Sequence, residues 1–258
     1  MSETILYKGD CLVEMNKIAD KSVDMILCDL PYGTTQNKWD IVIPFDKLWN
    51  HYNRIIKDNG VIALFCDGLF QAKLILSNES NWKYNLVWNK ILSTGFLNAN
   101  RMPLRSHEEI SIFYKNQCTY NPQMTKGKPL HGKGTNKNVE NFNCYGRYKF
   151  VDNAGSTDKF PISILDFQKP HPSKCVHPTE KPTALLEYLI KTYTNENETV
   201  LDNCMGSGST GVACKFTNRN FIGIEKDDKY FEIAKQRISN PETFCKLKDD
   251  KISKYDLF

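Results

Sequence analysis

Asp29, Leu30, Pro31 and Tyr32 form the stretch best suited to chemistry, and they directly follow the apolar run of residues 23–28. A strand that ends at this tetrapeptide presents a carboxylate, backbone carbonyls of restricted geometry and an aromatic ring at the mouth of a sheet. Such groups suit a planar base with an exocyclic amine, because the ring can stack on the base and the oxygens can accept its N–H groups. An ordinary turn with a packed ring is the alternative that the same four residues fit.

A second chemical motif is the glycine-rich loop of residues 206–211, Gly-Ser-Gly-Ser-Thr-Gly, which follows an expected strand and opens an expected helix. Glu225 ends the next expected strand. This pattern is typical of a nucleotide site, because glycines let the backbone approach the ligand, the helix N-terminus offers N–H groups, and the acid accepts ribose hydroxyls. A loop with a purely structural role is the alternative.

The elements that must position these motifs alternate along the chain. Short apolar segments rich in β-branched residues predict strands at 22–28, 61–65, 84–88, 109–114, 199–202 and 220–225. Apolar residues at helical spacing predict a helix over 45–56, with Asn59 and Gly60 as its stop signal. Further helices are predicted from Pro182, from Thr210 and around 231–238. This alternation is typical of a doubly wound α/β fold with a mostly parallel sheet.

The order of the two motifs differs from that of a dinucleotide-binding fold. Such a fold continues with several strands after the acid, yet only 33 residues follow Glu225. We therefore expect the missing strands to come from the N-terminal half, in a wrapped, permuted order. In a doubly wound sheet both Asp29 and the glycine loop then lie at the carboxyl ends of strands, where ligands bind.

Residues 117–170 interrupt the alternation with Asn, Lys, Gly and single aromatics that show no sustained periodicity. We predict an inserted irregular module here, between a first part of the core, 1–116, and a second part, 171–258. Residues 117–175 hold nine Lys or Arg and four acids, a net charge of +5, whereas the rest of the chain is −1. This charge favours a surface for phosphates, and a solvated lysine-rich loop is the alternative.

The composition narrows the class of protein. With 40% hydrophobic and 25% charged residues, the chain fits a soluble globular protein. We expect neither a signal peptide nor a membrane span, because the first residues lack basic and apolar regions and no apolar run is long enough. Nine scattered cysteines without a C-x-x-C pair indicate a reducing cytoplasm rather than a disulfide scaffold or zinc site. His107 and His177 are not at metal-ligand spacing, so no metal is expected.

Four motifs together resemble the S-adenosylmethionine-dependent amino-methyltransferases of DNA, in the β-type motif order. The motifs are Gly9-Asp10-Cys11 before Asp29-Leu-Pro-Tyr32, Ser106-His-Glu-Glu109 before 110–115, His-Pro-Thr-Glu-Lys-Pro at 177–182, and the stretch 201–210 with Gly223-Ile-Glu225. The resemblance covers residues 5–115 and 171–238, and it implies a Rossmann-like methyltransferase sheet. The segment 117–170 falls where this family carries its target-recognition region.

The resemblance implies a role for each matching residue. The cofactor-binding roles fall to Asp10, Cys11, Lys181, Asp202, Gly206, Ser207, Gly208, Thr210 and Glu225. In this set Asp202 and the glycine loop cradle the methionine portion of the cofactor, and Glu225 holds the ribose hydroxyls. Asp10 and Cys11 border the adenine. Lys181 either helps to hold the methionine carboxylate or is a surface lysine at the start of a helix.

The same resemblance implies that Asp29, Leu30, Pro31 and Tyr32 take a flipped target base. An acid in the first position resembles the adenine-N6 subset, whereas cytosine-N4 relatives more often have serine there. Hydrogen bonds from the amine to Asp29 and a neighbouring carbonyl can localise the lone pair toward a sulfonium methyl group. Leu30 replaces the family's usual proline but supplies the same carbonyl. Asn203-Cys204 replaces Pro-Phe, so no phenylalanine packs on the cofactor there.

Double-stranded DNA is the expected partner, bound by the inserted module. Phosphate contacts are predicted for the lysines and base reading for the arginine of this module, namely Lys126, Lys128, Lys133, Lys137, Lys149 and Arg147. A homodimer and a cognate restriction endonuclease are partners that the resemblance leaves open, in a cytoplasmic, nucleoid-associated protein of bacterial or phage type. Alternatives are a cytosine-N4 enzyme, a nicotinamide-dependent oxidoreductase, a nucleic-acid-binding protein with an inactive pocket, and RNA as the substrate.

Overall fold

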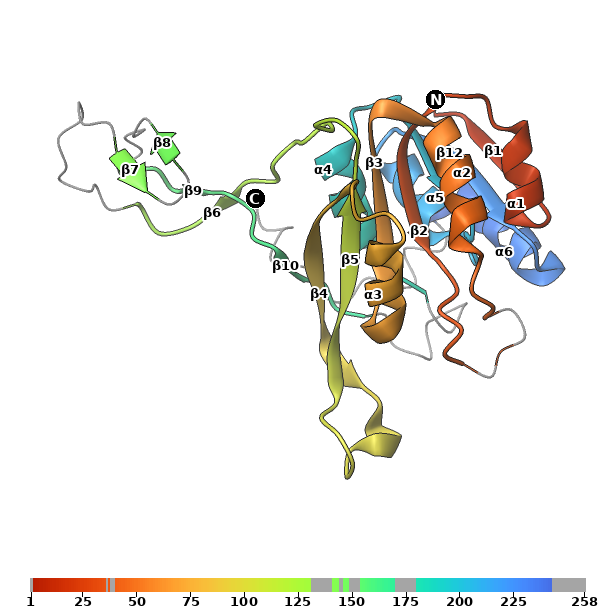
Figure 1. Cartoon of the computed structure of the whole chain (residues 1–258), viewed down its shortest axis with the longest axis horizontal. Helices are drawn as coiled ribbons and strands as arrows, with labels where there is room; N and C mark the ends of the chain where they lie inside the picture. Colours follow the sequence, from red (N-terminus) through yellow and green to blue (C-terminus); the bar gives the residue numbers. More distant parts are fainter. Residues whose placement is uncertain are drawn as a thin grey trace. The chain divides into compact units, whose positions relative to one another are not determined.

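The computed structural model describes residues 2–35, 37, 40–130, 154–169 and 180–242, together with the backbone of 141–143 and 146–148. Its main feature is an eight-stranded sheet with the order β1-β12-β11-β2-β3-β5-β4-β10 (Figure 1). The strands are β1 (Thr4–Lys8), β2 (Val23–Asp29), β3 (Ile56–Cys66), β4 (Trp82–Thr94), β5 (Arg105–Phe113), β10 (Ile164–Asp166), β11 (Thr199–Asp202) and β12 (Asn220–Glu225).

One strand of this sheet runs against the others. β5 is antiparallel to both of its neighbours, β3 and β4, while every other pairing in the sheet is parallel. The prediction of a doubly wound, mostly parallel sheet in permuted order is therefore confirmed, since β11 and β12 from the end of the sequence lie between β1 and β2. The carboxyl ends of β2, β11 and β12 consequently share one edge.

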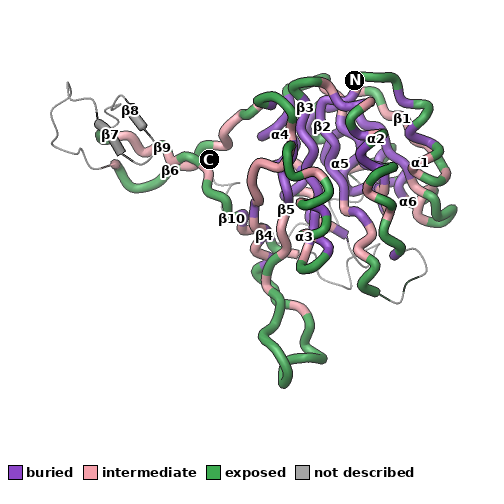
Figure 2. Tube along the Cα trace, viewed as in Figure 1, coloured by how far each residue is buried: buried purple, intermediate pink, exposed green. Residues whose placement is uncertain are grey.

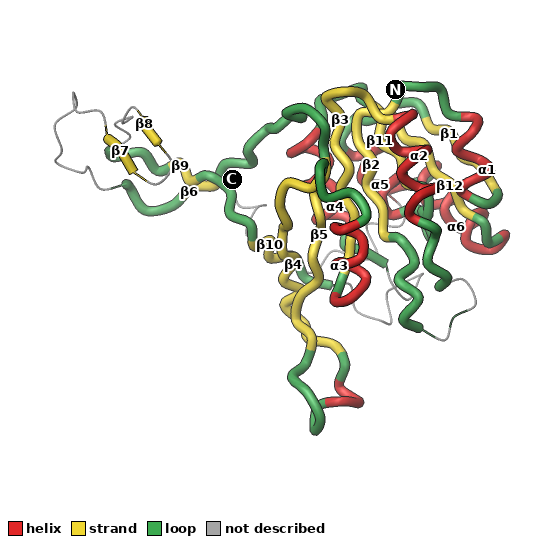
Figure 3. The backbone as a smooth tube through the Cα atoms, viewed as in Figure 1, coloured by secondary structure: helices red, strands yellow, loops and turns green. Residues whose placement is uncertain are grey.

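Helices cover both faces of the sheet (Figure 3). They are α1 (Cys11–Glu14), α2 (Phe45–Ile55), α3 (Gly68–Leu76), α4 (Thr183–Tyr193), α5 (Ser209–Phe216) and α6 (Asp228–Ser239). Alternate residues of β2 explain this layering, because Met25 and Leu27 pack into the core beneath α4, α5 and α6, whereas Ile26 and Cys28 pack into the core beneath α2 and α3. Each fully buried aliphatic side chain contributes roughly 1.5–3 kcal/mol to folding.

The predicted stop signal at Asn59 and Gly60 is wrong. Helix α2 ends at Ile55, and β3 begins at the next residue. The pairing with β2 then jumps from Val23–Ile56 to Met25–Val61, so the Asn-Gly pair lies in an irregular stretch of a strand. A Cβ on Gly60 would come within 2.9 Å of the Asp24 carbonyl oxygen, which explains the glycine by close backbone approach rather than by a helix end.

The described residues fall into two compact units. The smaller unit is Pro122–Pro161, and the larger contains the described residues on either side of it. The smaller unit has two short antiparallel ladders, β6 (Thr125–Lys126) with β9 (Asp158–Lys159) and β7 (Asn141–Asn143) with β8 (Gly146–Tyr148). The strand β10, which we placed in the inserted module, pairs with β4 in the main sheet. No helix in the described part of the chain is both long and apolar enough to cross a membrane.

Candidate active site

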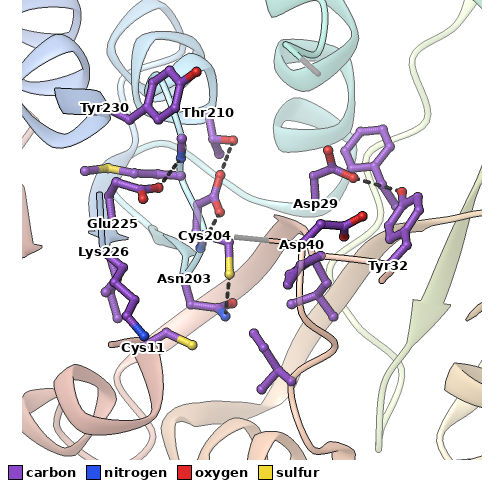
Figure 4. Close-up of a pocket in the computed structure, with 18 of the residues that line it drawn as sticks. Cys11, Asp29, Tyr32, Asp40, Asn203, Cys204, Thr210, Glu225, Lys226 and Tyr230 are labelled. Atoms are coloured by element: carbon purple, nitrogen blue, oxygen red, sulfur yellow. Dashed lines mark hydrogen bonds between the residues drawn. The ribbon is translucent and has the colours of Figure 1, made fainter. Parts of the chain in front are cut away.

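A cavity of about 710 Å³ opens at the edge of the sheet where β2, β11 and β12 end. It gathers residues from both predicted motifs, although Tyr32 and Gly206 lie 174 positions apart in the sequence. Its lining includes Asp29, Leu30, Pro31, Tyr32, Asp10, Cys11, Lys181, Asp202, Gly206, Ser207, Thr210 and Glu225. Of the predicted catalytic and cofactor-binding residues, Gly208 alone does not line it. Figure 4 draws Asp29 and Tyr32 on one side of this cavity and Thr210 and Glu225 on the other.

Asp29 is the last residue of β2, and both of its carboxylate oxygens have a partner. The Lys181 ammonium lies 2.8 Å from Oδ2, and the Tyr32 hydroxyl donates a hydrogen bond of 2.8 Å to Oδ1. Because the strand is buried up to Cys28, the carboxylate is the first polar group beyond the core. The acid is thus held in a fixed position by one charged and one neutral donor.

Lys181 connects Asp29 to a second acid that we did not predict. Its ammonium donates to Glu108 over 3.0 Å, and it also lies over the rings of Phe65 and Trp88, at 4.9 and 5.8 Å from their centroids. Burial alone would lower the pKa of Lys181, but Asp29 and Glu108 raise it above the ordinary value. The side chain is 10% exposed, so the reading of Lys181 as a surface lysine is wrong.

The charge network extends to Lys90 on β4, which the sequence also did not reveal. Lys90 is buried and lies 3.3 Å from Glu108. Burial lowers the pKa of Lys90. Burial alone would raise the pKa of Glu108, but Lys181 and Lys90 hold it below the usual range. Glu108 lies within the Ser106-His-Glu-Glu109 motif, so the sequence offered a signal for this residue. Nothing in the sequence around Lys90 marks it as the partner of Glu108.

The loop that follows Asp29 is held by another acid, Asp40, which is buried. The backbone amides of Gly33, Thr34 and Thr35 all donate to its carboxylate, at 2.8, 2.9 and 2.7 Å. Burial alone would raise the pKa of Asp40, but these amides and the Thr35 hydroxyl hold it below the usual range. Asp40 therefore fixes the turn beyond the tetrapeptide, a role that its position in a polar stretch did not indicate.

The aromatic ring of Tyr32 has a fixed orientation. It stacks on Phe70 of α3, with ring centroids 4.7 Å apart and an angle of 24° between the planes. Burial and the nearby carboxylate of Asp29 raise the pKa of Tyr32 well above its ordinary value, so the hydroxyl remains a donor. Leu30 is buried in the core and leaves only its backbone available to the cavity.

On the opposite side of the cavity, Asp202 ends β11 in a buried position without a charged partner. The Thr210 hydroxyl donates to it over 2.7 Å and the Cys204 amide over 3.1 Å. Among the described residues no lysine or arginine forms an ion pair with it. Burial consequently raises the pKa of Asp202 to about 6.

Glu225 ends β12 and receives two backbone amides. Gly206 donates to one carboxylate oxygen over 2.9 Å, and Asp227 donates to the other over 2.8 Å. Burial raises the pKa of Glu225 above the usual range. At the rim, Asp10 caps α1 by accepting from the Leu12 amide, and Lys226 lies 3.2 Å from its second oxygen.

The glycine loop depends on backbone conformations that favour glycine. Gly206 and Gly208 have φ values of +51° and +81°. A Cβ on Gly208 would also come within 2.9 Å of the Ala234 side chain, because α6 packs directly against the loop. Gly208 therefore shapes the loop from behind the cavity.

A buried arginine anchors this loop to two other elements. Arg237 of α6 donates to the carbonyl and the hydroxyl of Ser207, at 2.8 and 2.6 Å. It also forms a buried ion pair of 2.8 Å with Glu180, the residue before Lys181. The loop and the Lys181 segment are thus held by the same side chain.

The dipeptide Asn203-Cys204 fills the place of the family's usual Pro-Phe. Asn203 is buried, and its side-chain oxygen accepts a 2.5 Å hydrogen bond from the Tyr52 hydroxyl of α2. Cys204 lies in hydrogen-bonding contact with the thiols of Cys11 and Cys28. Burial raises the pKa of Cys28 to about 12, so this thiol packs beneath the site as a neutral, soft group. Among the described residues no cluster of His, Cys, Asp and Glu has a metal-binding arrangement.

The predicted DNA-binding residues are only partly described. Lys126 forms a 2.5 Å ion pair with Asp158, and Lys128 is exposed. The backbone of Arg147 lies in β8, and Lys133, Lys137, Lys149 and His177 lie outside the described residues. DNA binding by this unit stays a prediction.

Comparisons with known families, sequences and structures give concordant matches. Residues 23–236 match the family N6_N4_Mtase, described as DNA methylase. Type II methyltransferase M.HinfI of Haemophilus influenzae is 28% identical over 90% of this chain and 67% of its own length, and M2.LlaDCHI of Lactococcus lactis subsp. cremoris is 26% identical over 93% and 91%. The crystal structure of the M1.HpyAVI–SAM complex superposes with a TM-score of 0.60 at 25% identity, over 91% of this chain and 99% of that one.

Proposed function

Because the chain belongs to the N6/N4 DNA methylase family, we propose that it methylates the N6 amine of an adenine extruded from duplex DNA. As a member of this family it is a DNA methyltransferase that uses S-adenosylmethionine. The family covers both amine positions, so the choice of adenine is our proposal. The observation that carries it is the fixed Asp29 carboxylate in the same cavity as the glycine loop. The family assignment removes the nicotinamide-dependent oxidoreductase as an alternative.

The residues on the Asp202 side of the cavity fit the cofactor. A buried carboxylate without an internal cation is costly, and the ammonium of a methionine moiety supplies the missing charge. Glu225 keeps unused lone pairs on oxygens already oriented by two amides, which suits a ribose diol. Asp10 and the neutral thiol of Cys11 lie at the rim, where an adenine ring would lie. When bound, S-adenosylmethionine supplies an electrophilic methyl group on its sulfonium.

The residues on the Asp29 side suit an amine. A carboxylate has about four lone-pair sites, and Lys181 and Tyr32 use two of them, so sites remain for an N–H group of the base. This hydrogen bond and one to the Leu30 carbonyl would draw the amine lone pair out of conjugation and aim it across the cavity. Positioning of this kind, rather than strong general-base catalysis, is the main contribution of the chain. Asp29 is also the nearest acceptor for the proton that the methylated amine loses.

Extrusion of the base follows from the depth of the site. The amine of a paired adenine cannot reach Asp29 while it is stacked in a duplex, so the base must leave the helix. The free face of Tyr32 would stack the extruded base, since its other face packs on Phe70. The fixed ring would then hold the base plane in line with Asp29.

The test is methyl transfer to unmethylated duplex DNA, followed by nucleoside analysis. We expect labelled methyl groups to appear as N6-methyladenine. N4-methylcytosine as the product would overturn the adenine assignment and leave the family assignment intact. Tight binding of DNA with no transfer would favour the inactive-pocket alternative, and transfer to RNA alone would overturn DNA as the substrate.

A further inference from the structure

The hairpin between β4 and β5 ends in an apolar tip that nothing in the described chain covers. We call residues 91–104 the hairpin tip. Phe96 and Leu97 stand in a short 3-10 helix at its end and are 81% and 98% exposed, and Ile91, Met102 and Leu104 are also exposed. Figure 2 shows most of this tip as exposed. Large apolar side chains gathered at this exposure mark a contact surface rather than scattered surface residues.

The hairpin tip projects from the edge of the sheet that holds the cavity. β4 runs parallel to β2 and β3, so its end at Thr94 lies beyond the same edge as Asp29, and β5 returns from there. Lys90 and Glu108 at the base of the hairpin belong to the network that holds Asp29. In Figure 1 the hairpin extends past the other strands, on the side where β2 leads into its loop.

The stalk of the hairpin is ordered by its own contacts. Its pairing shifts register between Asn89–His107 and Thr94–Arg105, and the Thr94 hydroxyl donates to the Arg105 carbonyl over 3.2 Å. Lys90 donates to the same hydroxyl over 3.3 Å. Gly95 turns the chain into the tip with φ +88°. The tip is thus carried on a structured arm connected to the catalytic network.

The charge around the hairpin tip is positive. Arg101 and Arg105 are exposed, and residues 91–107 contain no acid. Arg105 forms one ion pair, with Asp67, at 3.3 Å and remains 64% exposed. Apolar side chains flanked by arginines are complementary to a duplex, because the cations meet phosphates while the apolar groups can enter between base steps. If the hairpin tip bound another protein instead of DNA, the apolar side chains would not need arginines around them.

We propose that the hairpin tip is a DNA wedge, with Phe96 and Leu97 filling the gap that the extruded target base leaves in the duplex. This inference rests on the proposed function and adds to it a second DNA contact, outside the inserted module. Extrusion breaks one base pair and two stacking contacts, and an apolar group in the gap replaces part of the lost stacking. The stalk places the wedge beside the mouth of the cavity into which the base moves.

The test compares two versions of a duplex that the wild-type protein methylates at a mapped adenine. In one duplex the target adenine is paired, and in the other it faces a mismatched base, which lowers the cost of extrusion. For the double variant Phe96→Ala/Leu97→Ala we expect a loss of at least about tenfold in the single-turnover rate on the paired duplex and less than about threefold on the mismatched one. Leu76→Ala is the matched control, since Leu76 is 73% exposed at the far end of α3 and lies outside the site. This control should keep the wild-type rate on both.

Other outcomes overturn the proposal. Equal losses on both duplexes, or wild-type rates on both, would exclude the wedge. A change from dimer to monomer in sedimentation, with an unchanged rate per active site, would assign the hairpin tip to contact with a second copy of the chain. Absence of methyl transfer by the wild-type protein would instead refute the proposed function, so the two failures are distinguishable.

Discussion

The two sides of the cavity each present an aspartate at the end of a parallel strand, and their surroundings differ. Asp29 is paired with the ammonium of Lys181 at 2.8 Å, and a second lysine stands behind Glu108. Among the described residues Asp202 has neutral donors, which include the Thr210 hydroxyl and the Cys204 amide, and no ion-pair partner. Burial therefore raises the pKa of Asp202 to about 6.

Under the proposed function, this contrast matches the charge of the ligand that each side would receive. The amine of a base is neutral, so a carboxylate that binds it needs its countercharge from the protein itself. A cofactor ammonium carries its own charge, and an internal lysine would compete with it. The proposed base-binding side would accordingly be complete before any ligand arrives, whereas the proposed cofactor side would become electrostatically balanced on binding.

Asp29→Ala should have the largest effect, at least about 10³-fold on the rate of methyl transfer, because it removes the acceptor that orients the amine. Lys181 keeps Glu108 as its partner in this variant, so the fold should persist. Single-turnover transfer and thermal unfolding measure the two quantities. Asp29→Asn, which keeps one acceptor oxygen, should retain more activity than alanine. Full activity of the alanine variant would exclude the role of Asp29.

Lys181→Met tests whether the base-binding side depends on its internal countercharge. The substitution leaves Asp29 and Glu108 facing each other without the ammonium between them, and breaking such a pair costs about 3 kcal/mol. Urea unfolding measures this loss. Adding Glu108→Gln removes one of the two charges and should recover part of the stability, as a double-mutant cycle can establish. Wild-type stability of Lys181→Met would contradict the claim that this ammonium stabilises the pair of carboxylates.

Asp202 gives the cofactor side a pH dependence. Its folded-state pKa of about 6 lies above the usual 3.8, so the folded protein binds more protons between about pH 4 and 6. Stability without cofactor should therefore fall as the pH rises through this window, and Asp202→Asn should abolish the fall. Binding of S-adenosylhomocysteine requires the ionised form, so its Kd should rise about tenfold per unit below pH 6. Calorimetry checks both, and a flat Kd would exclude the pairing of Asp202 with the ammonium.

Lys226→Met should have the smallest effect. Lys226 and Asp10 form a rim ion pair at 3.2 Å, with side chains 77% and 46% exposed. Such pairs contribute about 0.5 kcal/mol or less, so unfolding should be unchanged and the cofactor Kd should change less than about threefold. A loss of stability comparable to that of Lys181→Met would contradict the argument that the exposed ion pair contributes less than the buried one.

The sequence predicted the two carboxylates but not what surrounds them. The end residues of β11 and β12 are correct because turn residues flank short apolar runs, and Asp29 was placed at a strand end for the same reason. The charge network that reaches Asp29 through Lys181 could not be predicted, since Lys90, Glu108 and Lys181 come from separate segments and no local pattern records their meeting. The predicted helix stop at Asn59 and Gly60 is wrong because the pairing of β3 with β2 overrides this local signal. The hairpin tip was missed because exposure of Phe96 and Leu97 is a property of the assembled sheet.

The pairing of β1 with β12 joins two segments that the ribosome makes at very different times. Thr4–Lys8 pairs along its whole length with Asn220–Glu225, and the Glu3 amide donates to the Asn220 side chain across 217 positions of sequence. At about 5–20 residues per second, a ribosome needs roughly ten to forty seconds to travel between them. During that interval the earliest strand has an exposed edge, and Asp10 just beyond it has no Lys226. The segment that holds Asp29 is therefore made long before the glycine loop and Glu225, and this side of the sheet is completed only when β12 pairs with β1.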